Sequence, residues 1–200
     1  PTLLLSCKTM IRFLLHGGRL KLEDSRNDSY FQALTRDLED KDQVLFIGFA
    51  RRNEADRNEV FEREKGLILA QTNKSIEIVN ATYENLIEQV KSAKAIEITG
   101  GQSPELVTDL QKYPDFIASL SGKVVGGSSA GACLFSSYYW YGEENTVHEG
   151  LGLLPIRLVV HYGSSEYKAT DGDFKQLAST ANELELVKIE ECAWIERKLY

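Results

Sequence analysis

Short apolar runs alternate along the chain with longer stretches that mix apolar and charged residues. Short apolar runs bounded by turn residues predict buried strands, and the amphipathic stretches between them predict helices. The predicted strands cover residues 11–15, 43–49, 75–79, 95–99, 123–126, 158–160 and 184–189, and the predicted helices cover about 27–39, 54–72, 82–92, 103–120, 129–137 and 171–181. Because strands and helices alternate, the sequence predicts an α/β fold with a mostly parallel central sheet.

The length and composition are those of one globular domain. The chain has 200 residues, of which 42% are hydrophobic and 26% charged, values that argue against disorder. No internal repeat or Pro/Gly/Ser-rich linker divides the sequence, so we expect a single domain over residues 10–200. Residues 1–9 precede the single methionine, Met10, and are expected to be an extension.

Charge and cysteine content argue against several classes of protein. The net charge of −7 disfavours a surface that binds nucleic acid, because phosphate contacts need clustered Lys and Arg. The three cysteines Cys7, Cys133 and Cys192 form no CxxC pair, so neither a disulfide framework nor a structural zinc site is expected. No run reaches the roughly 18 apolar residues of a membrane span, and the first residues lack the long apolar core of a signal peptide. We therefore expect a cytoplasmic protein.

The segment 124–136, VVGGSSAGACLFS, carries the most informative motif. Residues 127–131 form a G-x-S-x-G pattern around Ser129, between a predicted strand and a predicted helix. This setting is typical of a nucleophile elbow, a tight turn that presents the serine at the edge of the sheet. The N–H of Ala130, at the start of the helix, would help to bind a developing oxyanion. An ordinary Gly/Ser loop, or an anion site at a helix start, is the alternative interpretation.

A serine nucleophile needs a base, and the sequence contains three histidines. His161 ends the apolar run LVVHYG, so its side chain would emerge at the end of a strand, and we expect it to be the base. His148 lies in a polar segment and is a weaker candidate. His16 precedes Gly17 and Gly18 and is expected to be a structural loop residue.

The acid that orients the base is expected between the serine and the histidine. Glu143 and Glu144 lie there, with Glu149 as a further option, although a solvated loop would also explain this acidic pair. Ser129 and His161 are only 32 residues apart. An α/β-hydrolase has the order nucleophile, acid, base but separates them by more chain, so that fold is disfavoured.

Three ordered segments resemble one family: GGSSAGA at 126–132, ITGGQSPEL at 98–106 and LGLLPIRLVVHYG at 151–163. The family is the peptidase E group of serine peptidases (family S51), which contains the aspartyl dipeptidases and, more distantly, the cyanophycinases. The similarity covers about residues 10–195 and includes VLFIGFA at 44–50. It implies a flavodoxin-like three-layer sandwich related to class I glutamine amidotransferases, with serine in place of their cysteine, and intracellular hydrolysis of short peptides.

The resemblance also implies roles for individual residues. Ser129 matches the nucleophile and His161 the general base. The family's acid falls about fifteen residues after the serine, which is Glu144 here, with Glu143 as the alternative. The implied reaction is acyl transfer through a covalent acyl-enzyme, and it needs no metal and no organic cofactor.

Three backbone groups match the family's oxyanion hole. Gly101, or its neighbour Gly100, and Ala130 are the expected N–H donors. These groups would stabilise the negative charge on the carbonyl oxygen during acyl transfer.

One departure from the family concerns specificity. Aspartyl dipeptidases carry an arginine shortly after the catalytic histidine, but the segment after His161 contains none. Lys168 or Lys175 could supply charge without the bidentate fork of arginine, and Tyr162 is a further candidate contact. Strict specificity for an N-terminal Asp is therefore not expected. The aromatic residues 138–141 either line a substrate pocket or pack as a helix end on the core.

We expect a short peptide as the binding partner, with no nucleic acid and no membrane, and leave a homodimer open. Two alternatives to a peptidase are a hydrolase of small esters or amides that uses the same site, and a binding protein that holds a small anion at the Ser129 turn.

Overall fold

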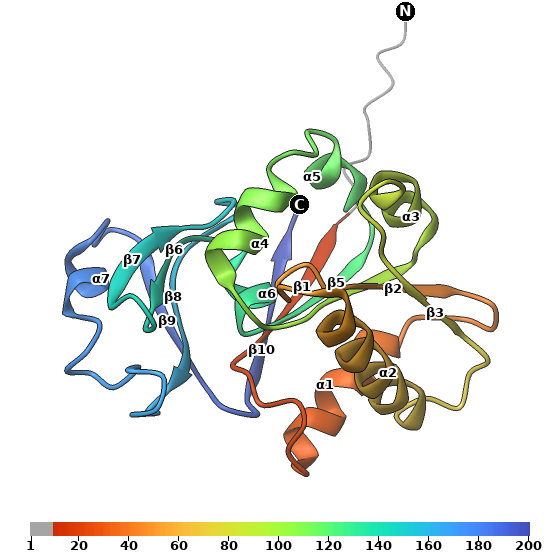
Figure 1. Ribbon diagram of the computed structural model, residues 1–200, viewed down its shortest axis with the longest axis horizontal. Helices are drawn as coiled ribbons and strands as arrows, with labels where there is room; N and C mark the ends of the chain where they lie inside the picture. The colour runs from red at the N-terminus through yellow and green to blue at the C-terminus, as the bar shows by residue number, and fades with distance from the viewer. Residues whose placement is uncertain (1–9) are drawn as a thin grey trace, which may run out of the picture.

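Two β-sheets lie side by side in the computed structural model, which describes residues 10–200 (Figure 1). The extension expected at residues 1–9 lies outside the described residues. The larger sheet has the strand order β10-β1-β5-β4-β2-β3, and the smaller has the order β7-β6-β8-β9. The larger sheet contains β1 (Ile11–His16), β2 (Gln43–Ile47), β3 (Glu77–Asn80), β4 (Ala95–Ile98), β5 (Val124–Ser128) and β10 (Trp194–Leu199). The smaller contains β6 (Ser136–Tyr141), β7 (Thr146–Glu149), β8 (Leu154–Tyr162) and β9 (Glu185–Glu190).

Most strand pairs are parallel. In the larger sheet only the edge pair β1–β10 is antiparallel. In the smaller sheet β6–β8 and β8–β9 are parallel, and the hairpin β6–β7 is antiparallel. The prediction of an α/β fold with a mostly parallel central sheet is therefore confirmed.

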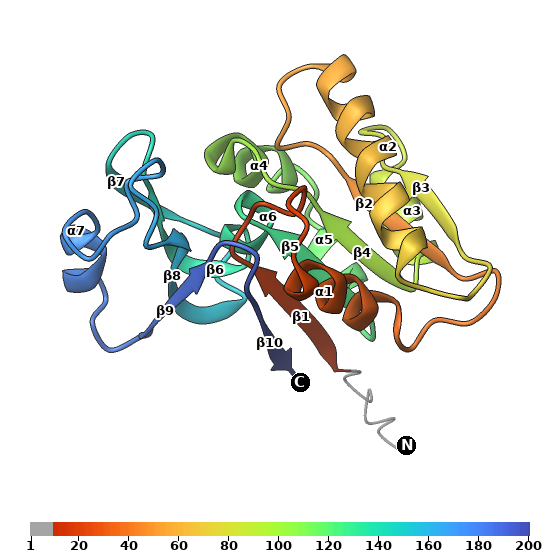
Figure 2. The same cartoon turned by 90° about the horizontal axis from the view of Figure 1, so that it is seen from below.

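Helices cover both faces of the larger sheet (Figure 2). Side chains alternate across each strand, so Phe13 and Leu15 of β1 pack on one face and Leu14 on the other. The face of Leu14 is covered by α1 (Ser25–Thr35) and α2 (Glu54–Ala70), and the opposite face by α3 (Leu86–Ser92), α4 (Ser103–Leu110), α5 (Phe116–Ser119) and α6 (Ala130–Cys133). The short α7 (Lys175–Ser179) packs on the smaller sheet through Leu177. Within residues 10–200, no helix is long and apolar enough to cross a membrane.

Several predicted helices are shorter than the sequence pattern indicated, and two of them end for a visible reason. The helix expected at 103–120 is divided into α4 and α5. Pro114 lies between them, and proline disfavours helical backbone at the preceding residue, Tyr113. The helix expected at 129–137 ends as α6 at Cys133, and the chain enters β6 at Ser136.

Three strands were not predicted: β6, β7 and β10. In β6 (SSYYWY), Tyr139 packs in the main core and Trp140 in the smaller cluster on α7, so apolar side chains face both sides and no alternation appears. Of the two alternatives for residues 138–141, the helix end is therefore wrong. In β10 (WIERKL) the side chains are half-exposed at a sheet edge, and their mixed polarity hides the strand.

Candidate active site

Ser129 lies in the turn between β5 and α6, at the carboxyl end of the larger sheet. Its backbone has φ 51° and ψ −106°, a strained conformation for a residue other than glycine. The turn leaves no room for side chains at the two flanking glycines. A Cβ added to Gly127 would lie 2.4 Å from the Gly131 carbonyl oxygen, and a Cβ added to Gly131 would lie 2.1 Å from the Ile98 carbonyl oxygen. The G-x-S-x-G motif is thus a steric requirement of a turn that presents one side chain at the sheet edge.

The structure brings His161 to Ser129, as the sequence predicts. Ser129 Oγ lies 3.0 Å from His161 Nε2, a hydrogen-bond distance. The imidazole is buried near the end of β8 and stacks on the Tyr167 ring, with 3.8 Å between ring centroids and an interplanar angle of 15°. Packing on both the serine and the tyrosine fixes the orientation of the ring.

The carboxylate beside His161 belongs to Glu191. Its Oε1 lies 3.0 Å from His161 Nδ1, while Arg19 Nε donates to the same oxygen over 3.3 Å. Glu191 directly follows β9, the strand that pairs with β8. A carboxylate on Nδ1 holds the proton there and leaves Nε2 free to accept the serine proton.

The expectation that Glu144 or Glu143 contacts His161 is wrong. Both lie in the turn of the β6–β7 hairpin, where Glu144 Oε2 is 3.0 Å from His148 Nε2. Glu143 Oε2 accepts from the Tyr141 hydroxyl over 3.0 Å. Glu149, the further option, is exposed on the edge strand β7. Neither ring nitrogen of His161 is left for these carboxylates, because Ser129 and Glu191 occupy both.

A signal for Glu191 was present in the sequence. Glu190 and Glu191 come directly after the predicted strand 184–189, as His161 comes at the end of the predicted strand 158–160. The carboxyl ends of neighbouring parallel strands meet at one edge of a sheet. The order nucleophile, acid, base restricts the acid to the chain between Ser129 and His161, whereas Glu191 lies after both.

Gly17 and Gly18, after β1, join the two sheets at the site. The Gly17 carbonyl accepts from the His161 N–H, and the Gly18 carbonyl accepts from the Cys192 N–H, each over 2.9 Å. A Cβ at Gly18 would lie 2.2 Å from His161 Cε1. The glycine pair therefore sets the position of the imidazole and of the segment that carries Glu191.

Burial sets the protonation of the site. Desolvation lowers the pKa of His161, while its hydrogen bond with Glu191 opposes this effect. The imidazole is therefore neutral at neutral pH, the state that a general base requires. The Cys133 thiol, beneath Ser129, is fully buried, and burial raises its pKa to about 12, which leaves it inert as a nucleophile.

The other two histidines have structural partners. His16 is fully buried, its Nε2 lies 2.8 Å from Asn27 Oδ1, and its Nδ1 accepts from the Gly18 N–H over 3.0 Å. Burial lowers the pKa of His16 to about 4. His148 stacks on Tyr139 and pairs with Glu144. Among residues 10–200, neither imidazole forms a hydrogen bond with Ser129 Oγ, whose partner is His161.

The residues expected to supply the oxyanion donors lie in the backbone around Ser129. Ala130 is the first residue of α6, where the N–H has no intrahelical acceptor. An added Cβ at Gly100 would lie 3.1 Å from Ser129 Cβ, so the backbone of this loop passes directly beside the serine. Gly101 follows with φ +153° and lines the cavities next to Ser129. These positions agree with an oxyanion hole formed by Ala130 and the Gly100–Gly101 loop.

Two cavities meet at Ser129 and His161. The first, about 240 Å³, is walled by aromatic and apolar groups and is called the aromatic cavity; its distinguishing residues are Trp140, Tyr141, Val160 and Lys168. The second, about 330 Å³, is called the cationic cavity; its distinguishing residues are Arg19, Lys21, Arg51 and Arg63. The two share Gly101, Ser129, Glu143, His161 and Tyr167.

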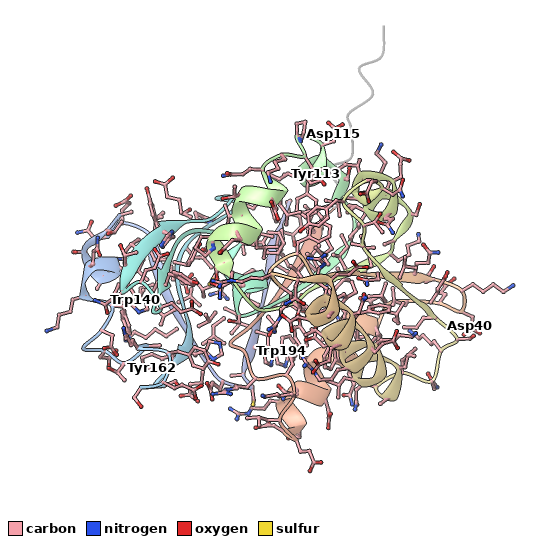
Figure 3. The ribbon with its side chains drawn as sticks, viewed as in Figure 1. Asp40, Tyr113, Asp115, Trp140, Tyr162 and Trp194 are labelled. Carbon is pink, nitrogen blue, oxygen red and sulfur yellow. The ribbon has the colours of Figure 1, made fainter. Side chains whose placement is uncertain are left out.

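The predicted substrate residues separate into two groups. Lys168 lines the aromatic cavity, and its carbonyl accepts from Trp140 Nε1 over 2.7 Å. Tyr162 and Lys175 line neither cavity. The Tyr162 hydroxyl donates to Asp171, and Lys175 is an exposed residue at the start of α7. Trp140 and Tyr162 both lie at the end of the molecule formed by the smaller sheet, opposite Asp40 (Figure 3). The arginines of the cationic cavity were not predicted.

Similar solved structures support this fold. A peptidase from an acI-B1 actinobacterium superposes with a TM-score of 0.69 at 21% identity, over 95% of this chain and 84% of the other. A peptidase E candidate from Listeria monocytogenes EGD-e gives 0.67 at 16% identity, over 96% of this chain and all of the other. Comparison with curated proteins gives no match. The model of peptidase family S51 matches residues 13–198. That match covers almost the whole chain, which therefore belongs to peptidase family S51 and is a serine-type peptidase.

Proposed function

We propose that the protein hydrolyses short peptides by acyl transfer, with Ser129 as nucleophile, His161 as general base and acid, and Glu191 as the orienting carboxylate. One observation carries the proposal. A continuous chain of contacts links Ser129 Oγ to His161 Nε2 and His161 Nδ1 to Glu191 Oε1, with 3.0 Å at each step. This arrangement activates a serine hydroxyl that is otherwise a weak nucleophile.

The reaction proceeds in two halves. His161 Nε2 takes the Ser129 proton as Oγ bonds to the scissile carbonyl carbon, and the resulting oxyanion accepts from the Ala130 and Gly101 N–H groups. The C–N bond then breaks, and His161 gives its proton to the leaving amine. Water attacks the acyl-ester, again losing a proton to His161, and Ser129 leaves with that proton as the carboxylic acid is released. Each oxyanion donor contributes roughly 3–4 kcal/mol in comparable sites.

The size of the cavities favours a short substrate. The aromatic and cationic cavities, about 240 and 330 Å³, adjoin Ser129. They lie near or below the lower end of the range of small-ligand pockets, which starts at roughly 300 Å³. A peptide lying across Ser129 would place its acyl residue in one cavity and its leaving residue in the other. A dipeptide or a similarly short peptide is the substrate that this arrangement fits.

A fluorophosphonate probe tests the nucleophile. The probe is expected to attach to Ser129, which peptide mapping identifies. The protein is expected to cleave members of a dipeptide set, and the cleavage rate should fall in proportion to the fraction of protein that is labelled. The matched control is Ser137→Ala, which changes a half-buried serine on β6 that lines neither cavity. A folded protein that neither labels at Ser129 nor cleaves any dipeptide would refute the proposal and favour a binding protein. Labelling with cleavage of esters but no peptide would favour an esterase.

A further inference from the structure

The two cavities at Ser129 differ in charge. The aromatic cavity is lined by two carboxylates and one lysine: Glu143, Glu166 and Lys168. The cationic cavity is lined by Arg19, Lys21, Arg51 and Arg63, against the two acids Glu64 and Glu143. In a chain whose net charge is −7, four cations around one small cavity are a local reversal of the overall charge. A substrate lying across Ser129 therefore meets a wall of mixed charge on one side and a basic wall on the other.

Arg51 and Arg63 are only weakly paired within the protein. The carboxylate that faces Arg51 is that of Asp56, 4.0 Å from Nη1, at the limit of an ion pair. Among residues 10–200, Arg63 forms one ion pair, with 3.1 Å between Nη2 and Glu64 Oε1. Glu64 is buried, and desolvation raises the pKa of its carboxyl group, which opposes its ionisation beside Arg63. The Nε atoms of both arginines are buried without an acceptor among residues 10–200.

Arg19 differs from this pair. Its guanidinium contacts the carboxylates of Glu166 and Glu191 and lies over the Tyr167 ring, 5.1 Å from the centroid. Because of these contacts, Arg19 positions the Glu191 carboxylate and the Tyr167 ring, which stacks on His161. Lys21 is exposed and forms no ion pair within residues 10–200, so its ammonium group is available to pair with a bound anion. The cations free to bind an anion are therefore Arg51, Arg63 and Lys21.

We propose that Arg51 and Arg63, assisted by Lys21, bind the C-terminal carboxylate of the substrate, so that the leaving residue occupies the cationic cavity and the N-terminal residue the aromatic cavity. The inference rests on the proposed function, because it requires a peptide bond at Ser129. Guanidinium groups are suited to this role, since each presents paired N–H donors to a carboxylate. Glu166, which is paired with Arg19, and Glu143, which lines both cavities, place carboxylates near the N-terminal ammonium.

Chain geometry links this subsite to substrate length. In a dipeptide the C-terminal carboxylate lies one residue, roughly 3.5 Å of chain, beyond the scissile bond. Both cavities adjoin Ser129, so the cavity that holds the leaving residue also receives a carboxylate at that distance from the scissile bond. A longer peptide would place an uncharged peptide group there instead. The subsite therefore makes the enzyme prefer substrates that end directly after the leaving residue.

The test compares each member of a dipeptide set as the free acid and as the C-terminal amide. In the wild-type protein, kcat/KM is expected to be about tenfold or more higher for the free acid, the effect of a charge-assisted pair. In Arg51→Gln and in Arg63→Gln the acid-to-amide ratio is expected to fall about tenfold, mainly through KM. Arg52→Gln is the matched control, because Arg52 adjoins Arg51, is 71% exposed and lines neither cavity. Its ratio is expected to stay at the wild-type value.

Three results would overturn the subsite. They are an acid-to-amide ratio near one in the wild type, a ratio unchanged in both arginine variants, and a preference that follows an acidic N-terminal side chain instead of the C-terminal carboxylate. If Ser129 labels with fluorophosphonate while the ratio is near one, only the subsite fails. If the probe does not label Ser129 and the protein cleaves no dipeptide, the proposed function fails as well.

A binding measurement covers variants that fold poorly. Calorimetric titration of the Ser129→Ala protein with the same dipeptide acids and amides reports recognition without turnover. Tighter binding of the acids by about tenfold supports the subsite, and equal affinity overturns it.

Discussion

Ser129 and its two partners are placed by regions of different kinds. A contiguous motif, residues 127–131, shapes the turn at the end of the larger sheet and presents the serine. His161 and Glu191 are 30 residues apart and come from the ends of two neighbouring parallel strands of the smaller sheet. A nucleophile of this type is therefore visible in local sequence, whereas its acid is determined by which strands are neighbours.

The two regions are joined by the loop after β1. The Ser129 N–H donates to the His16 carbonyl over 2.9 Å, and the following Gly17 carbonyl accepts from the His161 N–H. One short segment thus holds the elbow of the larger sheet and the histidine of the smaller sheet in register. Changes in the elbow should abolish peptide cleavage. Changes in the joint, the loop of Gly17 and Gly18 after β1, should misplace His161.

The largest effect is expected for Ser129→Ala, which removes the nucleophile and leaves the turn intact. Peptide cleavage should fall by roughly 10⁴-fold or more, since the oxyanion donors and binding alone retain little rate. The rate is measured on the dipeptide set, with Ser137→Ala as the control and thermal unfolding as the check on folding. Retention of most activity in Ser129→Ala would show that chemistry occurs elsewhere.

A smaller effect is expected at the joint, in Gly18→Ala. The new Cβ would lie 2.2 Å from His161 Cε1 and must displace the ring, so kcat should fall by roughly 10–100-fold. Gly152→Ala is the matched control: Gly152 also has a positive φ, +70°, but no atom lies within 4 Å of its added Cβ. Both variants should lose about 1 kcal/mol of stability from backbone strain. If kcat is equal in the two, the joint does not position His161.

The pH dependence of kcat/KM tests the base. His161 must be neutral to accept the serine proton, and burial lowers its pKa below the usual value of about 6.5. Activity should therefore be complete at neutral pH and fall about tenfold per unit once the pH drops below that pKa. In Glu191→Gln this acid limb should move to lower pH, because Glu191 raises the pKa of His161. An acid limb above pH 7 in the wild type would contradict the assignment.

A further prediction concerns stability and His16, which lies outside the chemistry. Burial lowers its pKa from about 6.5 in the unfolded chain to about 4 in the fold. The unfolded state therefore binds the extra proton first, so stability is complete above about pH 6.5 and is lost as the pH falls toward 4, by about 3 kcal/mol. Urea unfolding of the wild type and His16→Gln at several pH values should give a shallower slope in the variant. Equal slopes of the unfolding free energy against pH in the two proteins would show that His16 does not cause the loss of stability at low pH.

Sequence patterns predicted the features that depend on neighbouring residues. The apolar runs located seven of the strands, and G-x-S-x-G located the elbow, because its glycines are required by contacts a few ångströms away. His161 was found from its place at a strand end. Glu191 and the arginines of the cationic cavity were missed, since their neighbours come from distant parts of the chain: Arg19 follows β1, Arg51 follows β2 and Arg63 lies on α2. Sheet order brings these side chains to one edge, and local pattern does not encode it.

The central claim is that Glu191, and not Glu144, orients His161 for attack by Ser129. The most direct measurement is kcat for dipeptide cleavage by Glu191→Gln and Glu144→Gln, compared with the wild type. Loss of the carboxylate on Nδ1 should lower kcat by about 10³-fold or more in Glu191→Gln, as in related triads. Glu144→Gln changes an exposed hairpin residue paired with His148 and should remain within about twofold. The opposite pattern, with Glu144→Gln inactive and Glu191→Gln active, would contradict the account.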